Sequence, residues 1–306
     1  MVDLAISVGS LRLKNPVLCA SGTFGYGLEY AEMIDLNRLG GIVVKGLSLK
    51  PHQGNPPPRL AETPAGMLNS IGLQNIGLAA FVREKLPRLR DYDTAVVVNI
   101  WGETVDDYCR LAEGLSRAGG VAALELNVSC PNKGGRVMLI GQSPELTGEL
   151  TEAVVAAGEL PVWVKLTPNV TDHLPVAQAA QEAGAEAVCL INTLLGLAID
   201  ARSHRPRLGS VLGGLSGPAI KPVALRMVWQ AAGAIAIPII GLGGIMTGID
   251  AAEFILAGAT AVQVGTANLV DPQASLQVLE GLAAFLEEQG LDGPQALRGR
   301  LDTGSG

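Results

Sequence analysis

Cys130 is the side chain in this sequence best placed to act as a base or a nucleophile. It lies in the segment Asn127-Val128-Ser129-Cys130-Pro131-Asn132, past the end of an apolar run. Cys19 and Cys189 lie inside apolar runs and are interpreted as small core residues. Residues 133–136, Lys-Gly-Gly-Arg, are typical of a mobile lid with glycine hinges. A thiol between a strand end and a lid favours proton abstraction or nucleophilic attack at a gated site.

Polar residues also end five of the apolar runs. They are Lys45, Asn99, Asn127, Lys165 and the pair Asn192-Thr193. Any one of them could simply anchor a loop. Buried lysines and asparagines are costly unless they are paired, however, so the whole set indicates a polar ligand pocket.

Glycine-rich loops follow the last two apolar runs, as GLGGI at Gly241–Ile245 and GTAN at Gly265–Asn268. A third cluster, GLSG, spans Gly214–Gly217. Loops in these positions often hold a phosphate group in β/α barrels, through backbone N–H groups. Each cluster alone is a weak signal, because turns need glycine in any case.

The elements that must position these residues are eight short apolar runs separated by helical patterns. The runs are Val17–Gly22, Gly41–Leu47, Ala95–Trp101, Ala123–Cys130, Val162–Thr167, Ala187–Thr193, Pro238–Gly243 and Ala261–Gly265. The clearest helical segments are Thr104–Ala118, Ser143–Gly158 and Thr171–Gly184. Such alternation predicts a parallel sheet, and eight βα units close most simply as a (β/α)8 TIM barrel. An open doubly wound sheet is disfavoured because GxGxxG is absent.

Three segments depart from the alternation. Leu4–Leu13 predicts an N-terminal β-hairpin that closes the bottom of the barrel. Ser48–Gly77 and Gly196–Gly217 predict long loops at the C-terminal face, where barrel enzymes carry their sites. We expect residues 1–306 to form one domain.

Composition excludes several other kinds of protein. The chain has 306 residues, a formal net charge of −7 and 4% aromatic residues, which disfavours nucleic acid as a partner. The N-terminus has no basic region before an apolar run, and the apolar run Ala231–Met246 is short and interrupted by Pro238, so neither a signal peptide nor a membrane span is expected. The four cysteines lack metal-ligand spacing, and we expect a cytoplasmic protein with reduced thiols and no metal.

The motifs together resemble the dihydroorotate dehydrogenases, specifically their class 1B, NAD-linked branch, and the resemblance covers nearly the whole chain. It is carried by LCASGTFGYG (18–27), VVKGLSLKP (43–51), NPPPRLAETPAGMLNSIGLQN (55–75), ELNVSCPN (125–132), VKLTPN (164–169), GLSGPAIKP (214–222) and the GLGGI and VGTAN loops. The lid at 133–136 is a departure, because it does not match the usual lid of the branch.

The resemblance implies an FMN-bearing barrel that oxidises (S)-dihydroorotate to orotate in pyrimidine (UMP) synthesis. Cys130 matches the base that removes the C5 proton while flavin N5 takes the hydride. The positions that match flavin contacts are Ser21, Lys45, Gly46, Asn99, Asn127, Lys165, Ile191, Gly217, Gly243, Gly244, Gly265 and Thr266. The positions that match substrate contacts are Lys45, Asn69, Ser70, Ile71, Gly72, Leu73, Asn127, Asn132, Asn192 and Thr193.

The resemblance also implies a partner. The chain has neither a dinucleotide fingerprint nor a cysteine cluster for iron and sulfur, so electrons need another route to NAD+. The branch uses a second subunit that carries FAD and a [2Fe–2S] cluster, assembled with a homodimer of the catalytic chain into a heterotetramer.

Three alternatives remain open at this point. Lys165 in VWVKLTP could be the nucleophile of a Schiff-base lyase on the same barrel. An FMN barrel that acts on another dihydropyrimidine or on dihydrouridine could use a similar cysteine. A non-catalytic binding module is disfavoured by the polar strand ends and by the position of Cys130.

Overall fold

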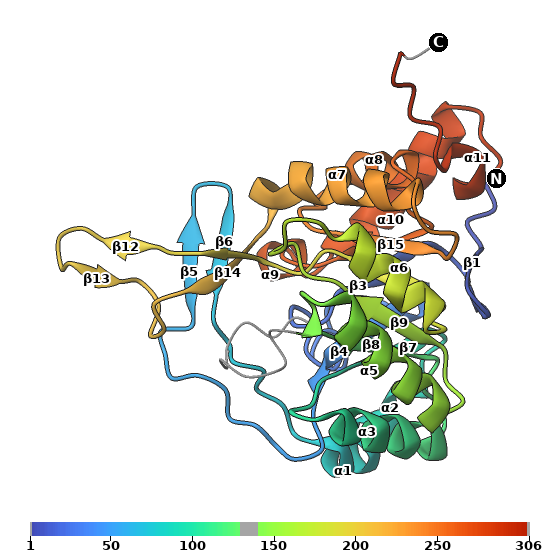
Figure 1. Cartoon of the computed structure of the whole chain (residues 1–306). Helices are drawn as coiled ribbons and strands as arrows, with labels where there is room; N and C mark the ends of the chain where they lie inside the picture. The colour runs from blue at the N-terminus through green and yellow to red at the C-terminus, as the bar shows by residue number, and fades with distance from the viewer. Residues whose placement is uncertain (1, 129–139, 305–306) are drawn as a thin grey trace.

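The computed structural model describes residues 2–128 and 140–304, and at its centre is a closed barrel of parallel strands (Figure 1). The barrel strands are β3 (Val17–Cys19), β4 (Gly41–Leu47), β7 (Ala95–Ile100), β8 (Ala123–Asn127), β9 (Val162–Lys165), β10 (Ala187–Leu190), β15 (Ile239–Leu242) and β16 (Ala261–Val264). They neighbour one another in chain order, and β16 pairs with β3 to close the ring. The predicted (β/α)8 TIM barrel is confirmed.

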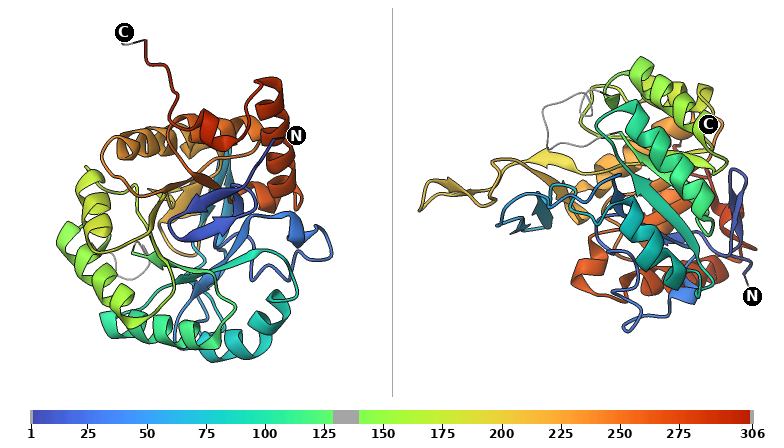
Figure 2. Two further views of the ribbon diagram at one scale, coloured as in Figure 1. Left: turned by 90° about the vertical axis from the view of Figure 1, so that its right-hand side faces the viewer. Right: turned by 90° about the horizontal axis from the view of Figure 1, so that it is seen from below.

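Helices surround this ring, as Figure 2 shows in the view along the barrel. They are α1 (Leu78–Ala80), η2 (Phe81–Lys85), α2 (Leu86–Leu89), α3 (Val105–Ala118), α5 (Pro144–Ala157), α6 (Leu174–Glu182), α7 (Lys221–Ala232), α8 (Gly248–Leu256), α9 (Ala267–Val270), α10 (Ala274–Glu288) and α11 (Pro294–Leu297), with short 3-10 turns η1 (Leu36–Arg38) and η3 (Pro218–Ile220). Thr104 and Ser143 cap α3 and α5 through their hydroxyls, as the predicted starts of these helices require. Of the described helices, none is both long and apolar enough to span a bilayer.

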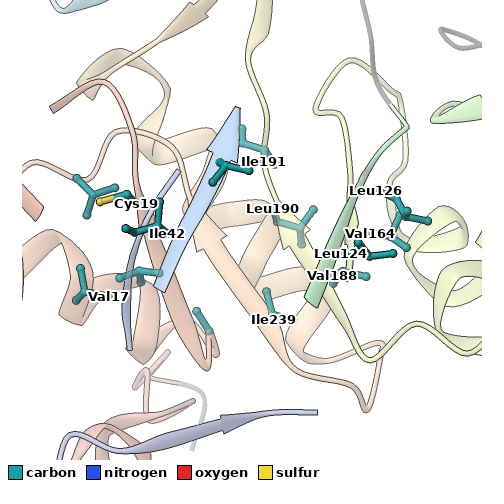
Figure 3. Close-up of a cluster of buried hydrophobic side chains, with 14 of the residues drawn as sticks. Val17, Cys19, Ile42, Leu124, Leu126, Val164, Val188, Leu190, Ile191 and Ile239 are labelled. Atoms are coloured by element: carbon teal, nitrogen blue, oxygen red, sulfur yellow. The ribbon is translucent and has the colours of Figure 1, made fainter. Parts of the chain in front are cut away.

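Side chains of the barrel strands alternate between the helices and the barrel interior. On β8, Leu124 and Leu126 pack outward with Val164 of β9 under the helices (Figure 3), whereas Ala123 lies in the interior cluster. Outward positions are therefore apolar throughout, and the inward positions near the carboxyl ends of the strands are free to be polar.

The N-terminal hairpin closes the opposite end of the barrel. Its strands are β1 (Ile6–Val8) and β2 (Leu11–Leu13), and they pair antiparallel. Ile6, Val8 and Leu13 are buried in the interior cluster, and the hairpin lies across the end of the barrel in Figure 2. This confirms the predicted hairpin at the bottom of the barrel.

The two segments predicted as long loops are partly strands, which corrects that prediction. Their strands are β5 (Leu60–Thr63), β6 (Gly66–Asn69), β11 (Leu194–Gly196), β12 (Ile199–Asp200), β13 (Arg205–Pro206) and β14 (Gly213–Ser216). β6 pairs with β14, so both segments join in one four-stranded sheet at the C-terminal face, and β12–β13 projects beyond it (Figure 1). Local sequence gave no sign of this pairing, because the partner strands lie far apart in the chain and are rich in glycine.

Candidate active site

A hydrogen-bonded network inside the barrel surrounds the carboxylate of Glu125, which is fully buried. The network joins strands β7, β8, β9 and β16. Its Oε1 accepts hydrogen bonds from Asn99 Nδ2 at 2.7 Å and from Lys165 Nζ at 3.1 Å. Ser21 Oγ lies 3.2 Å from the same oxygen and 3.2 Å from Lys165 Nζ. Gln263 Nε2 donates to Glu125 Oε2 at 2.6 Å, and its Oε1 accepts from Lys165 at 3.2 Å. Three residues that match flavin contacts, Ser21, Asn99 and Lys165, thus meet at one carboxylate.

Glu125 is held in its ionised form. Burial alone would raise the pKa of this carboxyl group, but the charge of Lys165 and the hydrogen bonds from Gln263, Asn99 and Lys165 outweigh burial and lower the pKa below 4.5. The interior of the barrel therefore contains an ionised carboxylate, 3.1 Å from Lys165 Nζ.

Sequence reasoning missed Glu125 and Gln263, although the strand pattern contains a signal for both. Each stands alone among apolar residues, in ALELN and AVQV, and the alternation that points Leu124 and Val262 outward points Glu125 and Gln263 inward. An acid and an amide at inward positions of a closed barrel must find polar partners there.

Lys45 and Gly46 lie within β4, at the point where its register with β7 shifts. Such an irregularity turns side chains away from their regular direction. Burial and the charge of Arg59 lower the pKa of Lys45 below its ordinary 10.5. A Cβ added to Gly46 would lie 2.8 Å from Asn99 Oδ1, so the backbone of β4 passes directly beside the network. A partly buried cation whose charged neighbour is another cation favours an anionic ligand.

The predicted substrate segment, residues 69–73, is held by the neighbouring chain. Asn69 Nδ2 donates to the carbonyl of Gly214, and the amide of buried Ser70 donates to the carbonyl of Arg59. Asn55 donates from its backbone to Ile71 at 2.9 Å and from its side chain to Ser70 Oγ at 2.8 Å.

The last two residues of that segment have left-handed backbones. Gly72 has φ +73°, and Leu73 has φ +56°, which is uncommon for a residue with a side chain. Asn75 holds this conformation, since its Nδ2 donates to the Leu73 carbonyl at 2.9 Å and to Ser48 Oγ at 2.8 Å. Backbone strain held in place by surrounding hydrogen bonds is typical of a ligand-binding segment.

Asn127 ends β8, Asn192 and Thr193 follow β10, and the backbone of each is held by hydrogen bonds with neighbouring groups. Tyr108 of α3 donates its hydroxyl to the Asn127 carbonyl at 2.7 Å. Asn169 Nδ2 donates to the Thr193 carbonyl at 3.0 Å, and the Asn192 amide donates to the backbone beyond β9. Tyr108 and Asn169 therefore position two predicted substrate contacts, and sequence reasoning identified neither.

Three glycine-containing loops converge beside the network. Gly217, Gly243 and Gly244 have φ values of +92°, +120° and +84°, which only glycine adopts without strain. A Cβ on Gly244 would lie 2.9 Å from the Gly217 carbonyl, and Thr266 Oγ1 donates to Ser216 at 2.8 Å. These contacts bring together the loops after β14, β15 and β16.

Two other predicted flavin contacts lie near these loops. Ile191 is buried, and its Cγ1 would lie 3.5 Å from a Cβ added to Gly243. Gly265 lies close to Ala20, which follows β3. Closely packed backbone without side chains, at the C-terminal face and after the last strands, fits a phosphate group. The residues present therefore fit a ligand with a phosphate at one end and a polar planar group over the network.

Cys130, Asn132 and the lid at 133–136 lie outside the described residues. Cys19 and Cys189 are both fully buried, and burial raises the pKa of Cys19 to about 12 and that of Cys189 well above 9. Their interpretation as core residues is confirmed, because a thiol that stays protonated is a poor nucleophile.

The Lys165 side chain donates to three acceptors, one of which is the buried carboxylate of Glu125. A Schiff-base nucleophile needs an amine that can approach a carbonyl carbon, whereas Lys165 Nζ already donates to three protein groups. The geometry therefore counts against the lyase alternative.

Comparison with known proteins gives a consistent result. The family model described as dihydroorotate dehydrogenase matches residues 3–286. A relative from Geotalea uraniireducens is 53% identical over 98% of this chain and 99% of its own length, and one from Thermodesulfovibrio yellowstonii is 54% identical over 95% and 96%. A third, from Bacteroides thetaiotaomicron, is 51% identical over 99% of this chain and all of its own. All three are named dihydroorotate dehydrogenase B (NAD(+)), catalytic subunit. The match along almost the entire length shows that the chain belongs to the dihydroorotate dehydrogenase family.

Proposed function

We propose that this chain is the FMN-bearing catalytic subunit of a cytoplasmic, NAD-linked dihydroorotate dehydrogenase. It oxidises (S)-dihydroorotate to orotate in the synthesis of UMP, and residues 1–306 form its single flavin-binding domain. The observation that carries the proposal is the network in which Ser21, just after β3, and Asn99 and Lys165, from β7 and β9, meet at Glu125.

The bound FMN supplies a hydride acceptor at N5 of its ring. The phosphate of FMN would be held by Gly217, Gly243-Gly244 and Gly265-Thr266, where three loops converge. Lys165 would offer positive charge to the flavin ring, to which reduction adds negative charge. Asn99 and Ser21 are fixed beside it by Glu125.

The substrate binds between the flavin and Cys130. Lys45 binds its carboxylate, which compensates for the unfavourable burial of that ammonium group. The amides of Asn69, Asn127 and Asn192, together with Asn132, provide both donors and acceptors for the urea-like edge of the ring. Cys130, as thiolate, would take the C5 proton.

Electrons leave the chain through a partner. We propose a second subunit with FAD and a [2Fe–2S] cluster, two copies of which join a homodimer of this chain and pass electrons to NAD+. The names of the relatives support this proposal, since "catalytic subunit" and "NAD(+)" imply that catalysis and NAD reduction are divided between chains.

The test is to purify the chain and measure its flavin content and its turnover with an artificial dye as acceptor. The proposal predicts one FMN per chain, a yellow protein, and dye reduction that depends on dihydroorotate and yields orotate. A colourless chain that does not take up added FMN contradicts it.

A further inference from the structure

We propose that Glu125 is a positioning residue for the redox chemistry: it is the fixed counter-ion of Lys165 beneath the flavin, and Gln263 holds the two in register. The inference rests on the proposed function, because it takes Lys165 as the cation nearest the flavin. Its consequence is that Glu125 keeps the reduction potential of the flavin low.

The Lys165 ammonium has a full set of hydrogen-bond acceptors. An ammonium has three N–H donors, and Lys165 Nζ has three acceptors, Ser21 Oγ at 3.2 Å, Glu125 Oε1 at 3.1 Å and Gln263 Oε1 at 3.2 Å. The side chains of Lys165 and Glu125 are only 7% and 0% exposed. The position of the cation is therefore set by protein groups before any ligand arrives.

The side-chain amide of Gln263 is held in one orientation by Glu125 and Lys165. Its Nε2 donates to Glu125 and its Oε1 accepts from Lys165, so each end of the amide faces the group of opposite polarity. The reversed amide would place NH2 against the ammonium and oxygen against the carboxylate. Gln263 thus stabilises one arrangement, with the negative charge on β8 and the positive charge on β9.

The charges of Glu125 and Lys165 act in opposite directions on a reduced flavin. Charges in a buried site act strongly on one another, because solvent screens them little. An uncompensated Lys165 would strongly stabilise the negative charge that reduction adds to the flavin. Glu125, 3.1 Å from Lys165, offsets most of that attraction. Since NAD+ is a weak oxidant, a flavin that releases electrons toward it must not hold them too tightly, and the buried pair provides this balance.

The experiment compares the midpoint potential of bound FMN in the intact chain and in three variants. Glu125→Gln removes the negative charge and preserves shape. The double variant Glu125→Gln with Gln263→Glu moves the carboxylate from β8 to β16, where residue 263 still faces Lys165 at 3.2 Å. The matched control is Glu186→Gln, which removes one negative charge at the hairpin end of the barrel, where Glu186 accepts hydrogen bonds from Ser10.

Glu125→Gln is expected to shift the reduction equilibrium at least tenfold toward reduced flavin, which is about 30 mV more positive for a two-electron couple. In the double variant, the reduction equilibrium of bound FMN is expected to return to within about threefold of that in the unmodified chain. Glu186→Gln is expected to leave the midpoint potential unchanged. An unchanged potential in Glu125→Gln, or a double variant that does not recover, overturns the inference.

If Glu125→Gln does not fold, the double variant decides alone. A folded double variant with the original potential supports the counter-ion role, and a double variant that is unfolded or altered in potential rejects it. If the unmodified chain binds no FMN, the proposed function itself has failed. If that chain binds FMN and the variants do not shift as described, only the role of Glu125 has failed.

Discussion

Lys165 Nζ lies 3.1 Å from Glu125 Oε1 in the closed interior of the barrel, and both side chains are almost entirely removed from solvent. Breaking a buried pair of this kind by removing one partner costs about 3–5 kcal/mol, because the remaining charge is left uncompensated. The pair is oriented by Gln263 and shares its carboxylate with Asn99 and Ser21. Polar groups arranged this firmly beneath an open barrel end are suited to a ligand whose charge changes during the reaction.

Cys130→Ala is expected to lower dye-linked turnover at least about a hundredfold, the usual contribution of a general base, with FMN still bound. Cys109→Ala is the matched control, because Cys109 lies on α3, where its thiol donates to the Ala153 carbonyl of α5. Both turnover and flavin content are measured on each purified variant. Full activity in Cys130→Ala would mean that another group is the base.

Gly244→Ala is expected to abolish FMN retention in an otherwise folded barrel. The new Cβ would lie 2.7 Å from Lys221 Cβ and 2.9 Å from the Gly217 carbonyl, and φ +84° disfavours any side chain. Gly290→Ala is the control, because Gly290 also has a positive φ, +65°, but has open space around it. This variant is expected to lose roughly 1–2 kcal/mol of folding free energy through backbone strain and to keep its FMN. Equal flavin content in the two variants would argue against a phosphate site at Gly244.

The affinity for orotate is expected to fall as pH rises toward 10.5. Burial and Arg59 lower the pKa of Lys45 below 10.5, so its positive charge is present at low pH and is lost as pH rises through that lowered value. Orotate binding, followed by the flavin spectrum, should weaken over this range in the unmodified chain. Lys45→Met should bind about ten- to a hundredfold more weakly at neutral pH, the contribution of a charge-assisted hydrogen bond.

Orotate binding is measured against pH in both the unmodified chain and Lys45→Met. The difference between the two curves gives the contribution of Lys45, because the thiol of Cys130 is present in both proteins. If the unmodified chain and Lys45→Met show the same pH dependence, Lys45 does not bind the carboxylate.

The sequence was sufficient to predict the barrel, the hairpin plug and the clustering of polar residues, because these follow from local patterns. Lys165 and Asn99 end apolar runs, and parallel strands bring their carboxyl ends to one face. Glu125 is harder to predict because it lies within an apolar run rather than at its end, although alternation with Leu124 and Leu126 points it inward.

Other features depend on contacts between distant parts of the chain. The pairing of Asn69 with Gly214 joins β6 and β14 across 145 residues. The action of Asn169 on Thr193 and of Tyr108 on Asn127 depends on loop conformations that only the folded chain defines. No local pattern in the sequence predicts these contacts.

The purified chain alone is expected to reduce artificial dyes with dihydroorotate but to reduce NAD+ barely. The physical reason is that NAD reduction needs a site for the nucleotide, which we assign to the partner subunit. Rates with dye and with NAD+ are compared on one preparation, and adding the partner should restore NAD reduction. Brisk NAD reduction by the lone chain would refute the division of labour.

The central claim is that this barrel transfers hydride from dihydroorotate to a bound flavin, and anaerobic mixing of the two tests it most directly. The visible flavin absorbance of the purified chain should bleach on addition of dihydroorotate, with one orotate formed for each flavin reduced. A flavin spectrum that stays oxidised under these conditions, in a folded chain carrying FMN, would contradict the account.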